Sequence, residues 1–166
     1  MWLNQRSREE IRSFLIAVFG FQFDDKIASI LIEAFPQMNF QFSRKTKKIK
    51  YIFLNEEVFA AYRPQTGKFS LGFGAAEYLI EHTETPRLRA VVQSDIQDFI
   101  KSGKSVFSQH VVNIDPLLHI GDEVIIVNEN DELLALGKLT YPPFYITQNV
   151  KGSCIKVRKG INARSK

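Results

Sequence analysis

Hydrophobic residues recur every three to four positions near the start of the chain, which predicts two amphipathic helices. The stretch 7–20, SREEIRSFLIAVFG, has Ser7 and Glu10 at capping-box spacing and Gly20 as the expected stop. The stretch 24–35 repeats the pattern, with an aspartate available as cap and a proline directly after it. We expect both apolar stripes to pack in a core.

From residue 39 the hydrophobic period changes from 3.6 to two, which is typical of strands. The residues Asn55–Glu56 separate two runs of β-branched and aromatic residues and predict a hairpin. The predicted strands are 39–43, 48–54, 57–63 and 68–73, followed by a short helix at 74–82 and a linker at 83–86. The first part, residues 1–85, is therefore predicted to be an α+β domain with a small antiparallel sheet.

The second part, residues 86–163, is predicted to be mainly β. Its expected helix, 94–103, begins at Ser94 and stops at Gly103. An irregular segment at 141–152 contains the unusual run YPPFYI. The predicted strands are 87–93, 105–112, 123–127, 133–139 and 153–160. Five strands joined by short turns around one helix predict a small closed barrel.

Charge is segregated along the chain, although the net charge is only +4. The stretch 43–50 has five basic residues and no acid, and the segment from Tyr141 to the end has six basic residues and no acid. The remainder is net acidic. Such segregation favours a polyanionic partner, while lysine-rich turns that only aid solubility are the alternative. Lys156 and Arg158 alternate in a predicted strand and should share one face.

Catalytic and metal-binding patterns are missing from the sequence. The single cysteine, Cys154, excludes a cysteine-rich zinc site, and His82, His110 and His119 have no metal-ligand spacing. Ser108, His110 and Asp115 are near in sequence, but a triad requires geometry. We expect no catalytic residue, no metal and no cofactor. The acids near the tight turn are interpreted as solvated turn residues: Asp122, Glu123, Glu129, Asp131 and Glu132.

Targeting signals are not evident either. No run approaches the roughly 20 apolar residues of a membrane span, and the first ten residues lack the apolar stretch of a secretion signal. A lone thiol is compatible with a reducing compartment. We therefore expect a cytoplasmic protein with no membrane partner.

The stretch FIKSGKSVF, residues 99–107, has two interpretations. A glycine after the last turn of a helix, with lysines near the negative end of its dipole, is a common C-cap. The same glycine would let a phosphate approach the backbone closely, and the lysines would supply the charge. The stretch alone leaves both open.

Several motifs together resemble one family. These are the strand–helix–GKSVF opening, the segment DPLLHIGDEV, the run VNENDELLALGK and the closing KGSCIKVRKG. In this order they are similar to a PUA domain, and to the C-terminal end of the archaeal tRNA-guanine transglycosylases that begin archaeosine synthesis. Residues 45–79 resemble the small domain that precedes PUA there. The catalytic barrel of that family has no counterpart in this sequence.

The resemblance implies a pseudo-barrel with an RNA-binding face made of the helix-to-strand loop and the closing strands. The implied RNA-binding residues are Lys101, Gly103, Lys104, Ser105, Val106, Phe107, Lys151, Gly152, Lys156 and Arg158. Lysines and arginine would neutralise phosphates, and Ser105 could donate to a phosphate or a 2′-hydroxyl. Val106 or Phe107 could offer an apolar wall to an unstacked base, although Phe107 could equally lie in the core.

The resemblance also implies the partner, which would be structured RNA and in particular tRNA at its acceptor stem and CCA end. The alternative is an accessory subunit that docks on a catalytic modification enzyme or on the ribosome by protein–protein contacts, since free-standing proteins of this layout resemble a translation-associated family that pairs with density-regulated protein. The double proline of YPPFYI departs from the usual connection, so contacts at 141–149 are left undefined.

Overall fold

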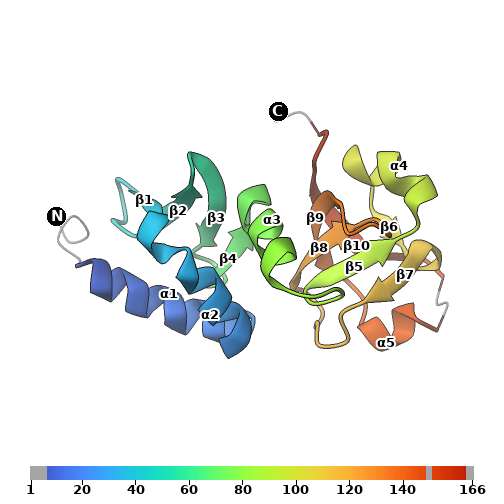
Figure 1. Ribbon diagram of the computed structural model, residues 1–166, viewed down its shortest axis with the longest axis horizontal. Helices are drawn as coiled ribbons and strands as arrows, with labels where there is room; N and C mark the ends of the chain where they lie inside the picture. The colour runs from blue at the N-terminus through green and yellow to red at the C-terminus, as the bar shows by residue number, and fades with distance from the viewer. Residues whose placement is uncertain (1–6, 149–150, 164–166) are drawn as a thin grey trace. The chain divides into compact units, whose positions relative to one another are not determined.

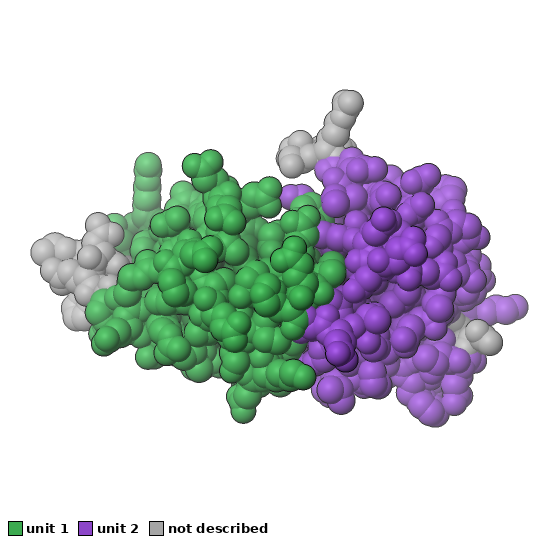
Figure 2. All heavy atoms as spheres, viewed as in Figure 1, with its two compact units in different colours: residues 1–82 green, residues 83–166 purple. Residues whose placement is uncertain are grey.

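The computed structural model describes residues 7–148 and 151–163. The chain divides into two compact units, Met1–His82 and Thr83–Lys166, which Figure 2 colours separately. Thr83–Pro86, the predicted linker, lies at the start of the second unit. No helix within the described ranges is long and apolar enough to cross a membrane.

The first unit packs helices against a four-stranded antiparallel sheet. Its strands follow chain order, β1-β2-β3-β4 (Figure 1). The elements are α1 (Arg8–Gln22), α2 (Asp25–Glu33), η1 (Phe35–Gln37), β1 (Asn39–Phe42), β2 (Ile49–Leu54), β3 (Glu57–Arg63), β4 (Lys68–Leu71) and α3 (Phe73–His82). Asn55 and Glu56 both have positive φ, as a type I′ hairpin turn requires. The predicted α+β class of this unit is confirmed.

Helix α1 shows one confirmed and one wrong prediction. Ser7 and Glu10 form the full capping box, because each side chain bonds the other residue's backbone N–H. Gly20 does not stop the helix, which continues to Gln22. The buried Gln22 side chain both donates to and accepts from the backbone of Phe69, at 2.7 Å each. This pair of bonds ties the helix end to β4 and outweighs the weak helix propensity of glycine.

The second unit is a nearly closed mixed sheet in the order β6-β10-β9-β8-β5-β7, which confirms the predicted pseudo-barrel (Figure 1). Its elements are β5 (Arg89–Val92), η2 (Ser94–Ile96), α4 (Gln97–Lys101), β6 (Val106–Phe107), η3 (Ser108–His110), β7 (Val111–Ile114), β8 (Glu123–Val127), β9 (Leu133–Leu139), α5 (Pro143–Ile146) and β10 (Ser153–Gly160). Strand β8 is buried along its whole length, as its continuous apolar run predicts.

The prediction of one strand at 105–112 is wrong. The turn η3 divides it into β6 and β7, which become the two edges of the sheet, so the unit has six strands where five were predicted. Ser108 is buried at this turn, and its backbone N–H donates to the carbonyl of Gly152. Because β6 and β7 are consecutive segments, the chain itself closes the barrel between them.

Buried charges hold the second unit together. Arg89 is fully buried, its Nε lies 3.1 Å from Oδ1 of Asp131, and its guanidinium donates to the carbonyl of Thr83. Burial lowers the pKa of Arg89, and the charge of Asp131 opposes that shift. Asp115 is also buried and accepts from the backbone N–H groups of Leu88 and Leu117.

Replacement of Asp115 by alanine should destabilise the second unit by about 3 kcal/mol. The change leaves the buried N–H of Leu88 and the partly buried N–H of Leu117 without their acceptor, and it removes the carboxylate that pairs with Arg87. Urea unfolding of the variant and the parent measures the effect. Asp95→Ala, at an exposed aspartate, is the control and should stay within about 0.5 kcal/mol of the parent. Equal stability of the Asp115 variant and the parent would contradict this assignment.

Candidate nucleic-acid interface

The loop after α4 ends the helix in a Schellman motif. The N–H of Lys104 donates to the carbonyl of Phe99 at 3.1 Å, and the N–H of Gly103 donates to that of Ile100 at 2.9 Å. Gly103 has φ +95, which a side chain would strain. Ser102 caps the same turn, because its hydroxyl donates to the carbonyl of Phe99. The C-cap interpretation of this stretch is thus confirmed.

The end of β10 lies directly against this loop. A Cβ built on Gly160 would be 2.2 Å from the carbonyl oxygen of Lys101 and 2.7 Å from the backbone nitrogen of Gly103. Only glycine fits at that distance. Two residues after Gly160, the N–H of Asn162 donates to the carbonyl of Lys101 at 3.0 Å. The loop and the closing strand are therefore held together by backbone contacts.

Strand pairing connects the loop to the other end of the candidate site. Strand β6 pairs antiparallel with β10, with Phe107 opposite Ser153 and Val106 opposite Ile155. The eight residues of β10 span roughly 26 Å at a rise of about 3.3 Å per residue. Gly103 therefore lies near the C-terminal end of β10, and Gly152 lies at its N-terminal end.

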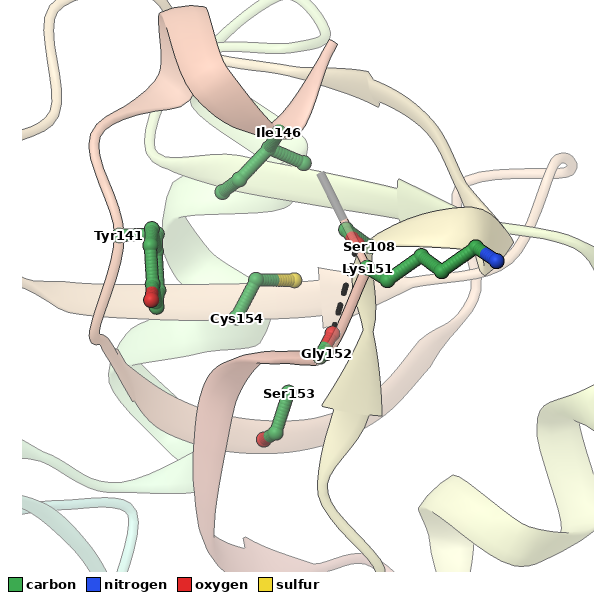
Figure 3. A pocket seen from close by; sticks show the side chains of 7 residues that line it. All are labelled: Ser108, Tyr141, Ile146, Lys151, Gly152, Ser153 and Cys154. Atoms are coloured by element: carbon green, nitrogen blue, oxygen red, sulfur yellow. Dashed lines mark hydrogen bonds between the residues drawn. The ribbon is translucent and has the colours of Figure 1, made fainter. Parts of the chain in front are cut away.

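Gly152 is fixed by Ser108, whose N–H and hydroxyl both donate to its carbonyl, at 3.0 and 3.3 Å (Figure 3). The φ of Gly152 is +128, a value that L side chains rarely adopt. Beside it is a small hollow of about 10 Å³, with room for roughly one water molecule, lined by Ser108, Tyr141, Ile146, Lys151, Gly152, Ser153 and Cys154. In Figure 3 the side chain of Lys151 points away from this hollow.

The two apolar residues predicted to contact RNA, Val106 and Phe107, differ in their exposure. Val106 is fully buried and forms part of the core, so it cannot offer a wall to a base. Phe107, next in the strand, points the other way and is 49% exposed. Of the pair, only Phe107 is available to a ligand.

The basic candidates also differ in their surroundings. Lys104 and Lys156 are exposed, and Lys101 and Ser105 are partly exposed on the same loop. Arg158 instead donates to the buried carboxylate of Glu123 at 2.8 Å. It lies at a bulge of β10, where the pairing with β9 shifts between Val157 and Lys159. Arg158 therefore contributes to the barrel while the residue stays exposed, and Lys104, Lys151 and Lys156 are the exposed lysines of the predicted set.

Several acids interpreted as solvated turn residues have structural roles. Glu123 is buried beside Arg158, Asp131 pairs with Arg89, and Glu129 accepts from the N–H and hydroxyl of Ser94. The buried Asn128, which sequence reasoning overlooked, accepts from the N–H groups of Asn130 and Glu132. No sequence signal distinguishes these three acids from solvated ones, because their partners are remote in the chain, whereas the partners of Asn128 are two and four residues away.

Ser108, His110 and Asp115, which are near in sequence, do not form a catalytic triad. One ring nitrogen of His110 faces Gln93 and the other faces Gln109, while Asp115 binds backbone N–H groups. Burial raises the pKa of Cys154 to about 11, so its thiol stays protonated at neutral pH. Among residues 7–148 and 151–163, no cluster of three or more histidine, cysteine, aspartate or glutamate side chains could hold a metal.

The basic stretch 43–50 lies in the first unit, in the connection from β1 to β2 and the start of β2. All five of its basic residues are exposed: Arg44, Lys45, Lys47, Lys48 and Lys50. The ammonium of Lys50 lies 5.1 Å from the ring centre of Tyr51. Arg164 and Lys166, counted in the basic C-terminal segment, lie outside the described residues.

Two family comparisons cover most of the chain. Residues 89–161 match the PUA domain, and residues 15–86 match the patch-forming domain C2 of tRNA-guanine transglycosylase. The chain is 33% identical over 159 residues to the tRNA-guanine(15) transglycosylase of Thermococcus onnurineus and 35% identical over 152 residues to that of Thermococcus kodakarensis. These alignments cover 96% and 92% of this chain but 27% and 26% of the relatives. The chain thus spans about a quarter of their length.

Solved structures share the fold. A hypothetical protein of Pyrococcus horikoshii superimposes with a TM-score of 0.74 at 19% identity, over 96% of this chain and 94% of that one. A conserved PUA domain protein of Thermoplasma acidophilum gives 0.64 at 12% identity, over 93% and 91%. Both likenesses extend over the two units.

Replacement of Gly160 by alanine should displace the loop after α4 and destabilise the second unit by about 2 kcal/mol, because the new methyl group overlaps backbone atoms. Thermal unfolding measures the change. Gly74→Ala, where the nearest atom is 3.7 Å away in a helix, is the control and should be neutral or slightly stabilising. If both variants unfold at the parent temperature, the contact at Gly160 is not the constraint described.

Proposed function

We propose that this chain, in which a patch-forming domain C2 precedes a PUA domain, binds structured RNA and catalyses no reaction of its own. The leading ligand is tRNA, bound at the acceptor stem and CCA end, in tRNA modification or translation. The relatives in the comparisons are named as tRNA-guanine(15) transglycosylases, which makes tRNA the first RNA to test.

One observation carries the proposal. Three lysines from separate segments lie along the edge formed by β6 and β10: Lys104 before β6, Lys151 before β10 and Lys156 within it. The exposed Phe107 lies on the same edge, and two glycines at positive φ flank it. A cationic edge with accessible backbone suits recognition of RNA by its phosphates and shape, in which sequence has little part.

The predicted contact residues are therefore Lys101, Gly103, Lys104, Ser105, Phe107, Lys151, Gly152 and Lys156. The lysines would neutralise phosphates, and the partly exposed Ser105 would donate a hydrogen bond to a phosphate or a 2′-hydroxyl. Arg158 remains a further predicted contact, because the residue is exposed even though its guanidinium also donates to Glu123.

Charge reversal on this edge should lower the affinity for tRNA and should also make that affinity less dependent on salt concentration. Lys104→Glu with Lys156→Glu removes two phosphate contacts, so the slope of log Kd against log salt should fall by about one unit for each contact. Filter binding or fluorescence anisotropy at several salt concentrations measures the slope. Lys26→Glu, an exposed lysine of α2, is the matched control.

An unchanged slope in the double variant would count against this interface, as would equal affinity of the parent for tRNA and for random duplex RNA. The alternative function, docking on a catalytic enzyme or on the ribosome, predicts a different result. The protein would then capture its partner from lysate equally well after RNase treatment. Incubation with bulk tRNA should change no nucleoside, and any change would contradict the non-catalytic assignment.

A further inference from the structure

The segment 141–146, YPPFYI, lies between β9 and β10 and contains the one-turn helix α5. Pro143 and Ile146 are buried and anchor it, while consecutive prolines restrict its backbone. The N–H of Tyr145 donates to the carbonyl of Pro142 at 3.1 Å, and the hydroxyl of Thr147 donates to that of Phe144 at 2.9 Å. Contacts within the chain therefore hold this segment.

This turn presents three aromatic side chains to solvent, which we name the aromatic platform: Tyr141, Phe144 and Tyr145. Their exposed fractions are 47%, 65% and 51%. The rings of Phe144 and Tyr145 meet edge to face, with centres 5.6 Å apart. Three exposed rings within five residues are an unusual concentration of apolar surface, and such patches mark interaction sites.

The surroundings of the platform indicate an anionic occupant. From Tyr141 to the end of the chain there is no aspartate or glutamate. Tyr141 lines the hollow beside Gly152, and in Figure 3 the face of its ring looks across that hollow toward Cys154. Lys151 borders the same hollow and directs its ammonium outward, where a phosphate would lie. Aromatic faces beside a cation match a nucleotide, whose base stacks while its phosphate is neutralised.

We name the edge with Lys104, Lys151 and Lys156 the lysine edge. Its position relative to the aromatic platform defines which part of a bound RNA would reach the platform. In Figure 1 α4 and α5 lie at opposite ends of the second unit, with β10 running between them. A helical RNA that follows the lysine edge would bring its end, or a bulge, to α5. Paired bases have their faces covered by neighbours, so only unpaired bases can stack on the rings.

We infer that the aromatic platform binds unpaired nucleobases that adjoin the helical part of the RNA. This inference rests on the proposed function, because it assigns a second contact to the same ligand. The platform adds affinity for unpaired nucleotides, and the lysine edge supplies affinity for the helix.

Binding should be compared for three defined RNAs. These are a blunt hairpin, the same hairpin with a short run of unpaired adenosines, and that hairpin with abasic nucleotides in the run. The parent protein should bind the adenosine-extended hairpin about fivefold or more tighter than the blunt one, because one stacked base contributes roughly that factor at least. The abasic extension, which keeps the phosphates, should give little of this gain.

Phe144→Ala with Tyr145→Ala should abolish the gain and leave affinity for the blunt hairpin unchanged. Both side chains are exposed, so the variant should keep its fold, which its unfolding temperature checks. Phe21→Ala, at a phenylalanine of the first unit that is 83% exposed, is the matched control and should keep the gain.

The outcomes separate the two proposals. If the double variant still binds the adenosine-extended hairpin more tightly than the blunt one, the inference about the platform is wrong and the lysine edge is unaffected. The same conclusion follows if the abasic run gives the full gain in affinity. Binding of the unpaired run alone, lost in the double variant, supports the platform and contradicts the helical contact. If the parent binds none of these RNAs, both proposals fail. If the double variant loses a protein partner and keeps its RNA affinities, the platform is a protein-docking surface and the inference is wrong.

Discussion

The close contact between Gly160 and the loop after α4 positions that loop against β10, on which the candidate interface is built. Without a side chain at residue 160, the end of β10 comes within reach of the backbone of Lys101 and Gly103. The loop is then held at one end by its own helix cap and at the other by β6, which pairs with β10. Lysines that are some fifty residues apart in sequence become one cationic edge because these backbone contacts are fixed.

The rest of the second unit depends on ion pairs in which one partner is buried and the other is partly exposed, and on the buried carboxylate of Asp115. Arg89 with Asp131, Arg158 with Glu123 and the backbone acceptor Asp115 each join segments that are remote in the chain. Buried pairs of this kind are costly to break, because the remaining partner stays buried without compensation. The exposed lysines and the exposed part of Arg158 are the charges of this unit's predicted site that a ligand can meet.

Local signals made most of the fold predictable from the sequence. The predicted bounds of the strands 57–63, 123–127, 133–139 and 153–160 agree with the structure, because each is a β-rich run between clear turns. The capping box at Ser7 was equally local. The prediction failed at Gly20, where a remote bond from Gln22 extends the helix, and at 105–112, where a short turn at Ser108 is fixed by Gly152.

The candidate site could be predicted in its segments but not in its details. The motif pattern located the loop and the closing strand, yet it could not tell that Val106 is buried or that Arg158 is held by Glu123. Those facts depend on strand register and on a bulge, which shift by one residue without any clear mark in the sequence. The exposure of the rings in YPPFYI likewise depends on how Pro143 and Ile146 pack.

Ultraviolet crosslinking of the bound protein to tRNA, followed by mass spectrometry of the crosslinked peptides, tests the central claim most directly. The account predicts crosslinks within residues 101–107 and 151–156, on the edge formed by β6 and β10. Crosslinks confined to the first unit, residues 1–82, would contradict it.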